Sequence, residues 1–214
     1  MKMLIVAATE SEIAIFRNYL TQNTGKHEID TLITGVGSIA TAFAVTKALT
    51  EHKYDFLLQA GVGGSFNKSI ALGELVLVTT EKYGDLGAED HDNYLDIFDM
   101  GLIAPDVAPH AEGTLKTPLH PLLERIQLKR TNGLTINLVS GNEKTIAHRS
   151  TTYNCDVESM EGAAFHYVCL QMGVPFAQVR AISNYVIPRD KSQWQMKDAI
   201  INLNKWLLGF VEEL

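Results

Sequence analysis

The sequence predicts an α/β protein: a single three-layer domain in which helices flank a mixed, mostly parallel central sheet. Apolar runs alternate with amphipathic stretches along the chain, which is typical of parallel strands joined by helices. The chain has 214 residues, a length that suits one domain with a full hydrophobic core. Because no linker, repeat or low-complexity tract divides it, we place residues 1–214 in one domain.

Three strands and two helices are predicted for the N-terminal part. Residues Met3–Ala8 (MLIVAA) are apolar throughout, as expected of a strand buried on both faces. In the next segment, Ile13, Phe16 and Leu20 share one helical stripe. The predicted elements are a strand over Met3–Ala8, a helix over Glu10–Thr21, a strand over Glu28–Thr34, a helix over Ile39–Glu51, and a strand over Tyr54–Ala60 that ends in Gly61–Gly64.

The rest of the chain begins with a strongly β-like segment at Gly73–Tyr83, whose end at Thr79–Tyr83 could form an antiparallel turn. We expect residues 83–113, which are irregular in pattern and acidic, to lie over the surface. Thr117 and Pro118 should open a short helix, because proline suits the first helical position. The remaining predicted elements are a strand over Leu134–Ser140, a helix over Glu161–Met172, a strand over Phe176–Ser183, and a helix over Trp194–Val211.

The composition argues against several classes of function. The formal net charge of -7 disfavours a nucleic-acid partner, which would require a basic face. No apolar run approaches the length of a membrane span, and the N-terminal run is too short for a signal peptide. The two cysteines, Cys155 and Cys169, have neither CxxC nor zinc-site spacing, so we expect a protein of the reducing cytoplasm.

We expect neither a metal nor a cofactor. The acidic cluster formed by Asp85 and residues 89–92 could mimic a metal site, but it lacks the spacing of a calcium loop. A solvated acidic loop is the favoured interpretation.

Several polar or glycine-rich positions are expected at one edge of the sheet. Glu12 lies just beyond the first predicted strand, and Gly61–Gly64 lie beyond the third. Glu161 begins a helix, and Asn184 ends the strand that follows it. Because ligands of such folds bind beyond the carboxyl ends of the strands, we expect these residues to surround one binding site.

Two interpretations of Glu12 remain open. Thr9 and Glu12 have the spacing of a capping box, in which the glutamate reaches back to the start of its own helix. The alternative is a general base that activates water. The local segment favours the cap, whereas the position at the binding edge favours the base.

Glu161 is a candidate ligand for a ribose, because an ionised carboxylate accepts hydrogen bonds at both oxygens and can hold two adjacent hydroxyls. Its charge could also serve only to stabilise the first turn of its helix. Met160 could pack beneath the sugar or belong to the core. Arg180, near the end of a buried strand, should pair with Glu161 or Glu158, because an unpaired buried guanidinium is costly.

Asn184 is a candidate ligand for a purine base. The N7 and O6 atoms of a 6-oxopurine are both acceptors, whereas adenine presents an acceptor and a donor. A side-chain amide can give both of its hydrogens to N7 and O6, so Asn184 favours hypoxanthine or guanine, although its carbonyl could turn to pair with adenine. Asn184 and Ser183 could instead be turn residues that close the strand.

Two glycine-rich segments offer backbone contact with a ligand. Gly35–Ala40 fits the dinucleotide fingerprint GxGxxA and supports a rival hypothesis, a non-catalytic nucleotide-binding module. The acidic residue that this fingerprint needs should end the following strand, but Asp55 begins it. Gly61, Val62 and Gly64 allow close approach of a substrate or form only a tight turn.

Together these segments resemble the nucleoside phosphorylase/nucleosidase superfamily, and within it first the methylthioadenosine/S-adenosylhomocysteine nucleosidases. The resemblance covers nearly the whole chain, from MKMLIVAATESE through TGVGSIATA, QAGVGGSF and LVSGN to its most specific part, MEGAA with VRAISN. It implies a nucleoside phosphorylase-like fold, a homodimer and a small-molecule nucleoside as substrate. By the same resemblance, Glu12 polarises the attacking water, and Met160 and Glu161 hold the ribose. Arg180 supports this group.

Two positions depart from the adenine-specific nucleosidases. Those enzymes have an Asp where this chain has Asn184, and an aromatic residue where it has Asn142–Lys144. The run RAISN followed by PRD and a Trp is similar instead to the futalosine hydrolase branch, whose substrate carries hypoxanthine. The resemblance then implies hydrolysis of futalosine to hypoxanthine and dehypoxanthine futalosine, a step of menaquinone biosynthesis. The alternative is a methylthioadenosine/S-adenosylhomocysteine nucleosidase or another purine nucleoside hydrolase or phosphorylase.

Residue types at the expected site favour hydrolysis over phosphorolysis. Glu12 and glycines stand where a phosphate would require Arg or Lys. The carboxylate on the arm of futalosine requires a cation, for which Arg189 and Lys191 are candidates. The same two residues could belong to a solvated loop in which Asp190 caps a helix.

Overall fold

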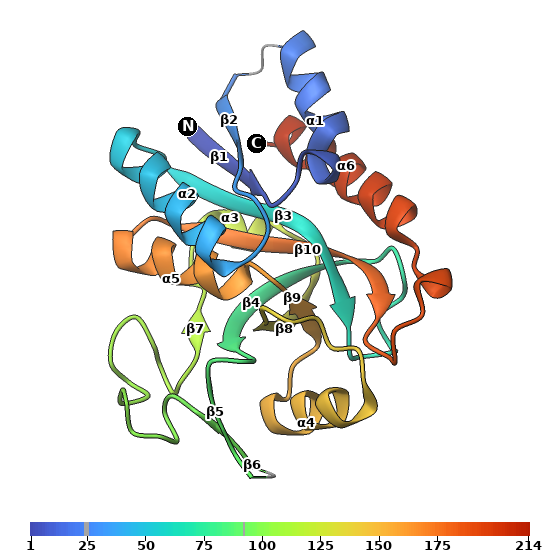
Figure 1. Cartoon of the computed structure of the whole chain (residues 1–214). Helices are drawn as coiled ribbons and strands as arrows, with labels where there is room; N and C mark the ends of the chain where they lie inside the picture. Colours follow the sequence, from blue (N-terminus) through green and yellow to red (C-terminus); the bar gives the residue numbers. More distant parts are fainter. Residues whose placement is uncertain (24–25, 92) are drawn as a thin grey trace.

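The computed structural model describes residues 1–23, 26–91 and 93–214, and it shows helices on both sides of a central sheet (Figure 1). Helices α1 and α6 pack together on one side, and α2 and α5 pack together on the other. The helices are α1 (Glu10–Gln22), α2 (Ser38–Glu51), α3 (Pro121–Arg125), α4 (Glu143–Tyr153), α5 (Gly162–Met172) and α6 (Met196–Glu212), with a 3-10 turn at Lys191–Gln193.

An eight-stranded sheet forms the middle layer. Its strands are β1 (Lys2–Ala7), β2 (Glu28–Ile33), β3 (Phe56–Ser65), β4 (Leu75–Tyr83), β7 (Leu115–Lys116), β8 (Lys129–Thr135), β9 (Val157–Ser159) and β10 (Phe176–Tyr185). A separate two-stranded sheet consists of β5 (Gly87–Asp90) and β6 (Asn93–Asp96).

Strand pairing is mostly parallel, as predicted, but part of the sheet closes on itself. β1 pairs in parallel with β2 and β3, and β3 pairs in parallel with β10. β4 is antiparallel to β10 and parallel to β8, while β9 is parallel to β8 and antiparallel to β3. Strands β3, β10, β4, β8 and β9 therefore form a closed ring of pairings. The antiparallel turn expected at Thr79–Tyr83 is instead part of the continuous strand β4.

The apolar run of β1 supplies both sides of the sheet. Ile5 belongs to the hydrophobic cluster beneath α1 and α6, which also contains Phe16 and Leu203. Its neighbour Leu4 belongs to the cluster beneath α2 and α5. Successive side chains of a strand point to opposite faces, so a strand covered by helices on both sides must be apolar at every position.

Most of the predicted elements lie within a few residues of the observed ones, but the boundaries of three elements were wrong. The strand predicted to end at Ala60 continues to Ser65 through the glycines, which pair with β10. The short helix begins at Pro121, not at Pro118, because the His120 side chain accepts the backbone N–H of Leu122 at its start. The strand predicted over Leu134–Ser140 is Lys129–Thr135, so residues 137–140 form a loop.

Elements β5, β6, β7, α4 and β9 were not predicted. Residues 83–113 hold the β5–β6 hairpin inside the segment expected to be irregular. Asp85, assigned to a solvated acidic cluster, is half-buried and accepts the backbone N–H groups of Asn137 and Leu138. Asp92, another member of that cluster, lies outside the described residues. Among the residues that the structure describes, no helix is both long and apolar enough to cross a membrane.

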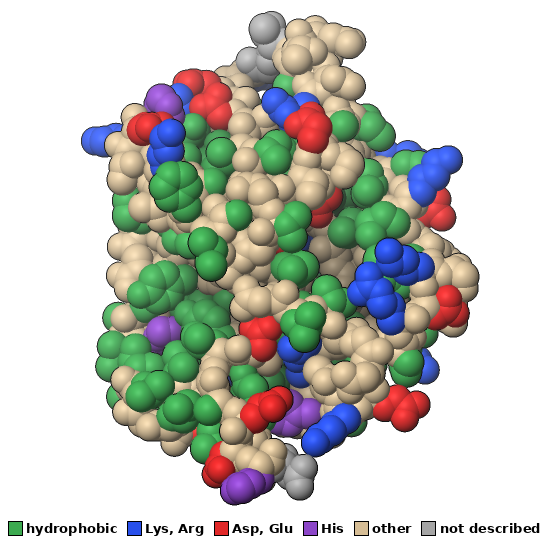
Figure 2. Space-filling view, viewed as in Figure 1, with side chains coloured by type: hydrophobic (Ala, Val, Ile, Leu, Met, Phe, Trp, Pro, Cys, Tyr) green, Lys and Arg blue, Asp and Glu red, His purple; other side chains and the backbone are tan. Residues whose placement is uncertain are grey.

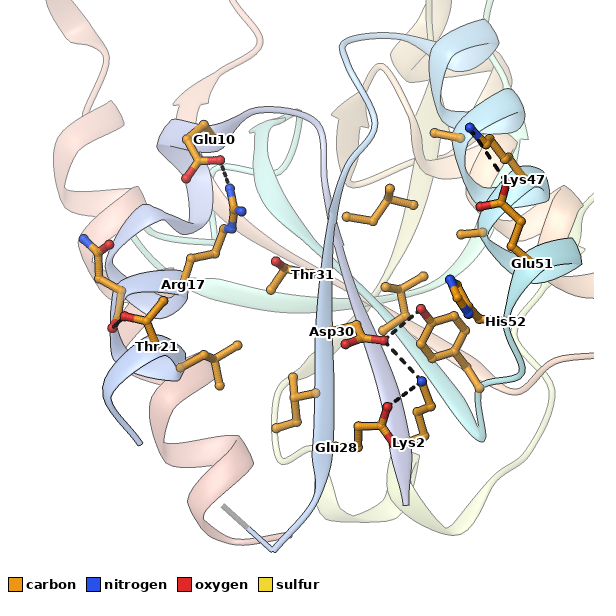
Figure 3. A pocket seen from close by; sticks show the side chains of 18 of the residues that line it. Lys2, Glu10, Arg17, Thr21, Glu28, Asp30, Thr31, Lys47, Glu51 and His52 are labelled. Atoms are coloured by element: carbon orange, nitrogen blue, oxygen red, sulfur yellow. Dashed lines mark hydrogen bonds and ion pairs between the residues drawn. The ribbon is translucent and has the colours of Figure 1, made fainter. Parts of the chain in front are cut away.

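A hollow of about 980 Å³ runs along the outer edge of β2 (Figure 3). Its charged side chains pair with one another: Lys2 pairs with Glu28 and Asp30, and Arg17 pairs with Glu10. Charged side chains on an edge strand discourage pairing with another chain. No predicted site residue is among the described residues along this hollow, so we do not assign the chemistry to it.

Candidate active site

A second cavity, of about 400 Å³, lies where the ends of β3 and β10 meet the start of α5. Ligand sites for small molecules have volumes of about 300–1,000 Å³. Glu12, Glu161 and Asn184 all line this cavity, although they are far apart in the sequence. The other predicted site residues along it are Val62, Gly64, Met160 and Ser183.

The remaining predicted site residues have other positions. Gly61 and Arg180 are buried directly behind the lining, where Arg180 contacts Glu161. Arg189 and Lys191 are exposed and are not among the described residues that line the cavity.

Glu12 forms the predicted capping box and also lies at the cavity wall. One carboxylate oxygen, Oε2, accepts the backbone N–H of Thr9 at 2.9 Å and the Thr9 hydroxyl at 3.1 Å. The other, Oε1, accepts the backbone N–H of Val62 at 3.0 Å. An ionised carboxylate offers about four acceptor positions. Since three are used, the helix start fixes the carboxylate at the cavity wall and leaves capacity for a water molecule.

Glu161 and Arg180 form a buried ion pair beside the cavity. Their Oε2 and Nη1 atoms are 3.3 Å apart, and both residues are at least 95% buried. Glu161 precedes the first residue of α5, and its Oε1 accepts the backbone N–H of Gly37 at 3.1 Å. Of the two predicted partners of Arg180, Glu161 is the one observed. The GxGxxA segment therefore binds Glu161 through Gly37.

Gly61 is required by close packing rather than by a turn. A Cβ atom at this position would lie 2.7 Å from Arg180 Nη1 and 2.8 Å from Glu12 Oε1. Real Cβ atoms essentially never make such short contacts. Any side chain at Gly61 would displace the arginine or the glutamate, so this glycine lets both groups approach the same point of β3.

Asn184 presents less hydrogen-bonding capacity than its residue type suggests. Its Oδ1 accepts the Ser183 hydroxyl at 2.8 Å, and its Nδ2 donates to the Tyr185 carbonyl at 3.0 Å. An amide nitrogen has two hydrogens. One hydrogen therefore remains for a ligand, whereas the sequence argument used both for N7 and O6.

A buried polar network behind the site was not predicted from the sequence. Gln178 Oε1 accepts Arg180 Nε at 2.9 Å, and Gln178 Nε2 donates to Glu81 Oε1 at 2.9 Å. Gln178 Nε2 also lies 3.0 Å from His166 Nε2. Burial lowers the pKa of His166 to about 3, so its ring is neutral and can accept this hydrogen. Because Gln178 Nε2 has two acceptors, Glu81 and His166, the Gln178 amide is fixed with its oxygen toward Arg180.

The Glu81 carboxyl group is enclosed between two glycines. A Cβ atom at Gly162 would lie 1.9 Å from Glu81 Oε1, and one at Gly133 would lie 2.4 Å from it. Burial raises the pKa of Glu81 to about 7, although hydrogen bonds from Gln178 and Thr135 oppose the shift. Sequence reasoning missed Glu81 because a lone glutamate in a β-like segment carries no sign of its burial.

The pKa of Glu81 predicts a pH-dependent contribution to stability. The folded-state pKa lies above the ordinary glutamate pKa of 4.5, so the folded protein binds more protons than the unfolded chain between these pH values. The free energy of unfolding should therefore fall as pH rises from about 5 to about 7. Glu81→Gln removes this titration. The Tm of the variant minus the Tm of wild type, measured in thermal melts, should therefore increase as the pH is raised from 5 to 8. A Tm difference independent of pH would contradict the assignment.

The loop of residues 137–140 is held against the cavity by charged side chains. Glu158 accepts the backbone N–H of Ser140 at 3.0 Å and also the Ser140 hydroxyl. Arg149 donates to the Leu138 carbonyl and to the Ser140 hydroxyl, both at 2.8 Å. Val139, between these two anchored positions, lines the cavity. Glu158, the other predicted partner of Arg180, therefore braces this loop together with Arg149.

At the other end of the cavity, Trp194 connects the lining to Arg189. Trp194 is among the residues that line the cavity, and the Arg189 guanidinium carbon lies 5.6 Å from the centroid of the Trp194 ring. This distance is typical of a cation–π contact. Lys191 belongs to the adjacent 3-10 turn, which Asp190 caps by accepting the backbone N–H of Ser192. The capping role considered for Asp190 is thus confirmed.

The sequence matches the family model of the phosphorylase superfamily over residues 5–212. The chain belongs to this superfamily. It is 32% identical over 174 residues to a futalosine hydrolase of Thermus thermophilus, with 79% of this chain and 75% of the relative covered. It is 25% identical over 200 residues to a 5'-methylthioadenosine/S-adenosylhomocysteine nucleosidase of Bacillus subtilis, with 86% of each chain covered.

The fold of this superfamily member is similar to that of solved nucleosidases. The native structure of futalosine hydrolase from Helicobacter pylori superposes with a TM-score of 0.80, covering 100% of this chain and 98% of the other at 18% sequence identity. This likeness confirms the predicted three-layer α/β fold. The sequence relatives are hydrolases of N-glycosidic bonds, which confirms the predicted enzyme class, a nucleosidase.

Proposed function

We propose that this nucleosidase hydrolyses the N-ribosidic bond of futalosine and releases hypoxanthine and dehypoxanthine futalosine, a step of menaquinone biosynthesis. The observation that carries the proposal is the meeting of Glu12, Glu161 and Asn184 on one cavity of nucleoside size. The futalosine hydrolase relative supports the choice of substrate. An amide at position 184 fits an acceptor on hypoxanthine, because a side-chain N–H is still available there.

Each of these groups has a distinct task in the proposed reaction. Breaking an N-ribosidic bond builds positive charge on the sugar and negative charge on the departing base. Glu161 accepts hydrogen bonds from the ribose hydroxyls and stabilises the positive sugar, and Glu12 takes a proton from the attacking water. Asn184 donates a hydrogen bond from its remaining N–H to the base as negative charge develops there. Because an amide does not release this proton at neutral pH, the departing base takes its proton from water. Rate is gained because these contacts strengthen in the transition state.

The lining of the cavity supports water rather than phosphate as the second substrate. Among the described residues along it there is no Lys or Arg. Arg180, a buried cation behind this lining, already donates Nη1 to Glu161 and to the Val62 carbonyl. Phosphate sites usually present Arg or Lys side chains, and a carboxylate at Glu12 repels a phosphate anion.

A competition assay tests the proposed substrate. Futalosine, methylthioadenosine and inosine are mixed at equal concentrations, and the loss of each nucleoside is followed by chromatography, because futalosine and inosine release the same base. We expect futalosine to be consumed first, with the ratio of kcat/KM values as the measure. Preferred cleavage of methylthioadenosine would reject futalosine as the substrate and leave the reaction class intact.

We further propose that Arg189, with Trp194, binds the carboxylate-bearing arm of futalosine. Arg189→Ala should raise KM for futalosine about tenfold, because a hydrogen bond to a charged group is lost. Inosine lacks the arm, so its cleavage should not change. Lys191→Ala serves as the comparison, since Lys191 lies in the next turn. Equal KM values for futalosine in wild type and Arg189→Ala would exclude this role.

We also propose a cytoplasmic homodimer. Val36, Ile39 and Phe43, in or next to α2, are 56%, 87% and 72% exposed, and hydrophobic side chains gather on the side where α2 and α5 lie (Figure 2). Exposed apolar patches commonly mark protein contacts. Phe43→Glu should therefore halve the mass measured by light scattering during size-exclusion chromatography. A wild-type monomer would contradict the proposal.

The cytoplasmic location is supported by the two cysteines, which are both free and buried, as suits a reducing compartment.

A further inference from the structure

Helix α1 is broken immediately after Glu12. Ile13 has φ −127° and ψ 17°, which lie outside the helical range, although the helix continues to Gln22. Helix kinks have identifiable causes, one of which is a side chain inserted into the backbone hydrogen-bond ladder. The first turn, which carries Glu12, therefore has a different direction from the rest of α1.

The inserted side chain is that of Asn204, from α6. In a regular helix the N–H of Phe16 would donate to the carbonyl of Glu12, four residues earlier. Here the Phe16 N–H donates to Asn204 Oδ1 at 2.9 Å, and the Glu12 carbonyl accepts Asn204 Nδ2 at 2.8 Å. The amide of Asn204 thus bridges the two groups at the break.

The orientation of this amide is determined by its partners. Nδ2 has two acceptors, the carbonyls of Glu12 and Ile200, at 2.8 Å and 2.7 Å. Oδ1 has one donor, the N–H of Phe16. A flipped amide would face two carbonyls with its oxygen and an N–H with its nitrogen, which is unfavourable. Asn204 is fully buried, so each of these bonds is shielded from water.

We infer that Asn204 is a positioning residue that aims the Glu12 carboxylate at the cavity. By holding the backbone carbonyl of Glu12, it keeps the first turn of α1 at the angle at which the carboxylate reaches the N–H of Val62. Without the amide, the buried N–H of Phe16 and carbonyl of Glu12 would lose their partners. They can recover hydrogen bonding only by pairing with each other, which straightens α1 and moves Glu12.

The inference rests on the proposed role of Glu12 as general base, and it predicts a specific kinetic pattern. Glu12 acts on the water, whereas Glu161 and Asn184 bind the nucleoside. Loss of the Asn204 bridge should therefore lower kcat and leave KM nearly unchanged. A displacement of about 1 Å at a reacting group can cost about 100-fold in rate.

The experiment compares Asn204→Leu, Asn204→Asp and Asn202→Leu with wild type in the full chain. Leucine has a similar size but no polar atoms, and aspartate keeps the acceptor for Phe16 while the ionised form cannot donate to Glu12. Asn202→Leu is the matched control, because Asn202 lies on the same helix and donates to the carbonyl of Gly73, away from the cavity. All assays are run well below the Tm of each variant, so that every enzyme is folded.

We expect kcat to fall about 100-fold in Asn204→Leu, with KM within about twofold, while Asn202→Leu keeps both values. The rate of hydrogen exchange at the backbone amide of Phe16 should also change in Asn204→Leu, because this N–H loses its acceptor on Asn204. If Asn204→Leu does not fold, Asn204→Asp carries the test with the same expectation of a lower kcat. An unchanged kcat in either folded variant, or a rise in KM alone, would overturn the inference. An inactive wild type would count against the proposed function instead.

Discussion

Replacement of Glu12 by glutamine is expected to lower kcat by about 10²- to 10⁴-fold, the usual contribution of a general base. Glutamine has nearly the same size, but its amide cannot take a proton from water at neutral pH. The carboxylate is held by Thr9 and Val62, which bind both of its oxygens. Binding of the nucleoside should persist, because Glu161 and Asn184 are unchanged.

Single-turnover kinetics and calorimetric binding to the same enzyme separate these two effects. Glu10→Gln is the matched control: Glu10 is in the same turn of α1 but is exposed and pairs with Arg17. Its replacement should leave kcat unchanged. If Glu12→Gln retained wild-type turnover, Glu12 would be only the cap of α1, which is the other interpretation of its spacing from Thr9.

Replacement of Glu161 by glutamine is expected to lower kcat/KM by about 10²- to 10⁴-fold. The carboxylate would accept hydrogen bonds from two ribose hydroxyls, and each hydrogen bond to a charged group contributes about 1.5–3 kcal/mol. Glutamine also leaves Arg180 without its counter-charge in a buried position. Breaking a buried pair in this way typically costs about 3–5 kcal/mol of stability, so the variant should also melt at a lower temperature.

A substrate that lacks the 2'-hydroxyl separates ribose binding from general destabilisation. Wild type should lose activity on 2'-deoxyinosine relative to inosine, and Glu161→Gln should lose much less, because the contact is already weakened. If wild type and Glu161→Gln lost activity on 2'-deoxyinosine relative to inosine by the same factor, Glu161 would not contact this hydroxyl.

Sequence patterns predicted the parts of this protein whose causes are local. The run at Met3–Ala8 indicated a strand between two layers, and β1 supplies apolar residues to both. Ligands of α/β sheets bind beyond the carboxyl ends of the strands, and this rule predicted that Glu12, Glu161 and Asn184 lie at one site. The prediction works because strand ends share an edge of the sheet whatever their separation in the chain.

The residues that were missed depend on partners distant in sequence. Phe16 and Asn204 are 188 positions apart, and Gln178 and Glu81 are 97 apart, so neither local pattern nor spacing indicates their contact. β9 has three residues, fewer than periodicity can indicate. The closed ring of strands likewise depends on the antiparallel pairing of β9 with the end of β3, where the sequence suggested either close approach of a ligand or a tight glycine turn.

The central claim is that this cavity cleaves the N-ribosidic bond of a 6-oxopurine nucleoside with water. The most direct test is product analysis after incubation of the wild-type enzyme with futalosine, with and without inorganic phosphate. We predict hypoxanthine and dehypoxanthine futalosine in equal amounts, formed at the same rate in both buffers. A sugar 1-phosphate as product, or no release of hypoxanthine, would contradict the account.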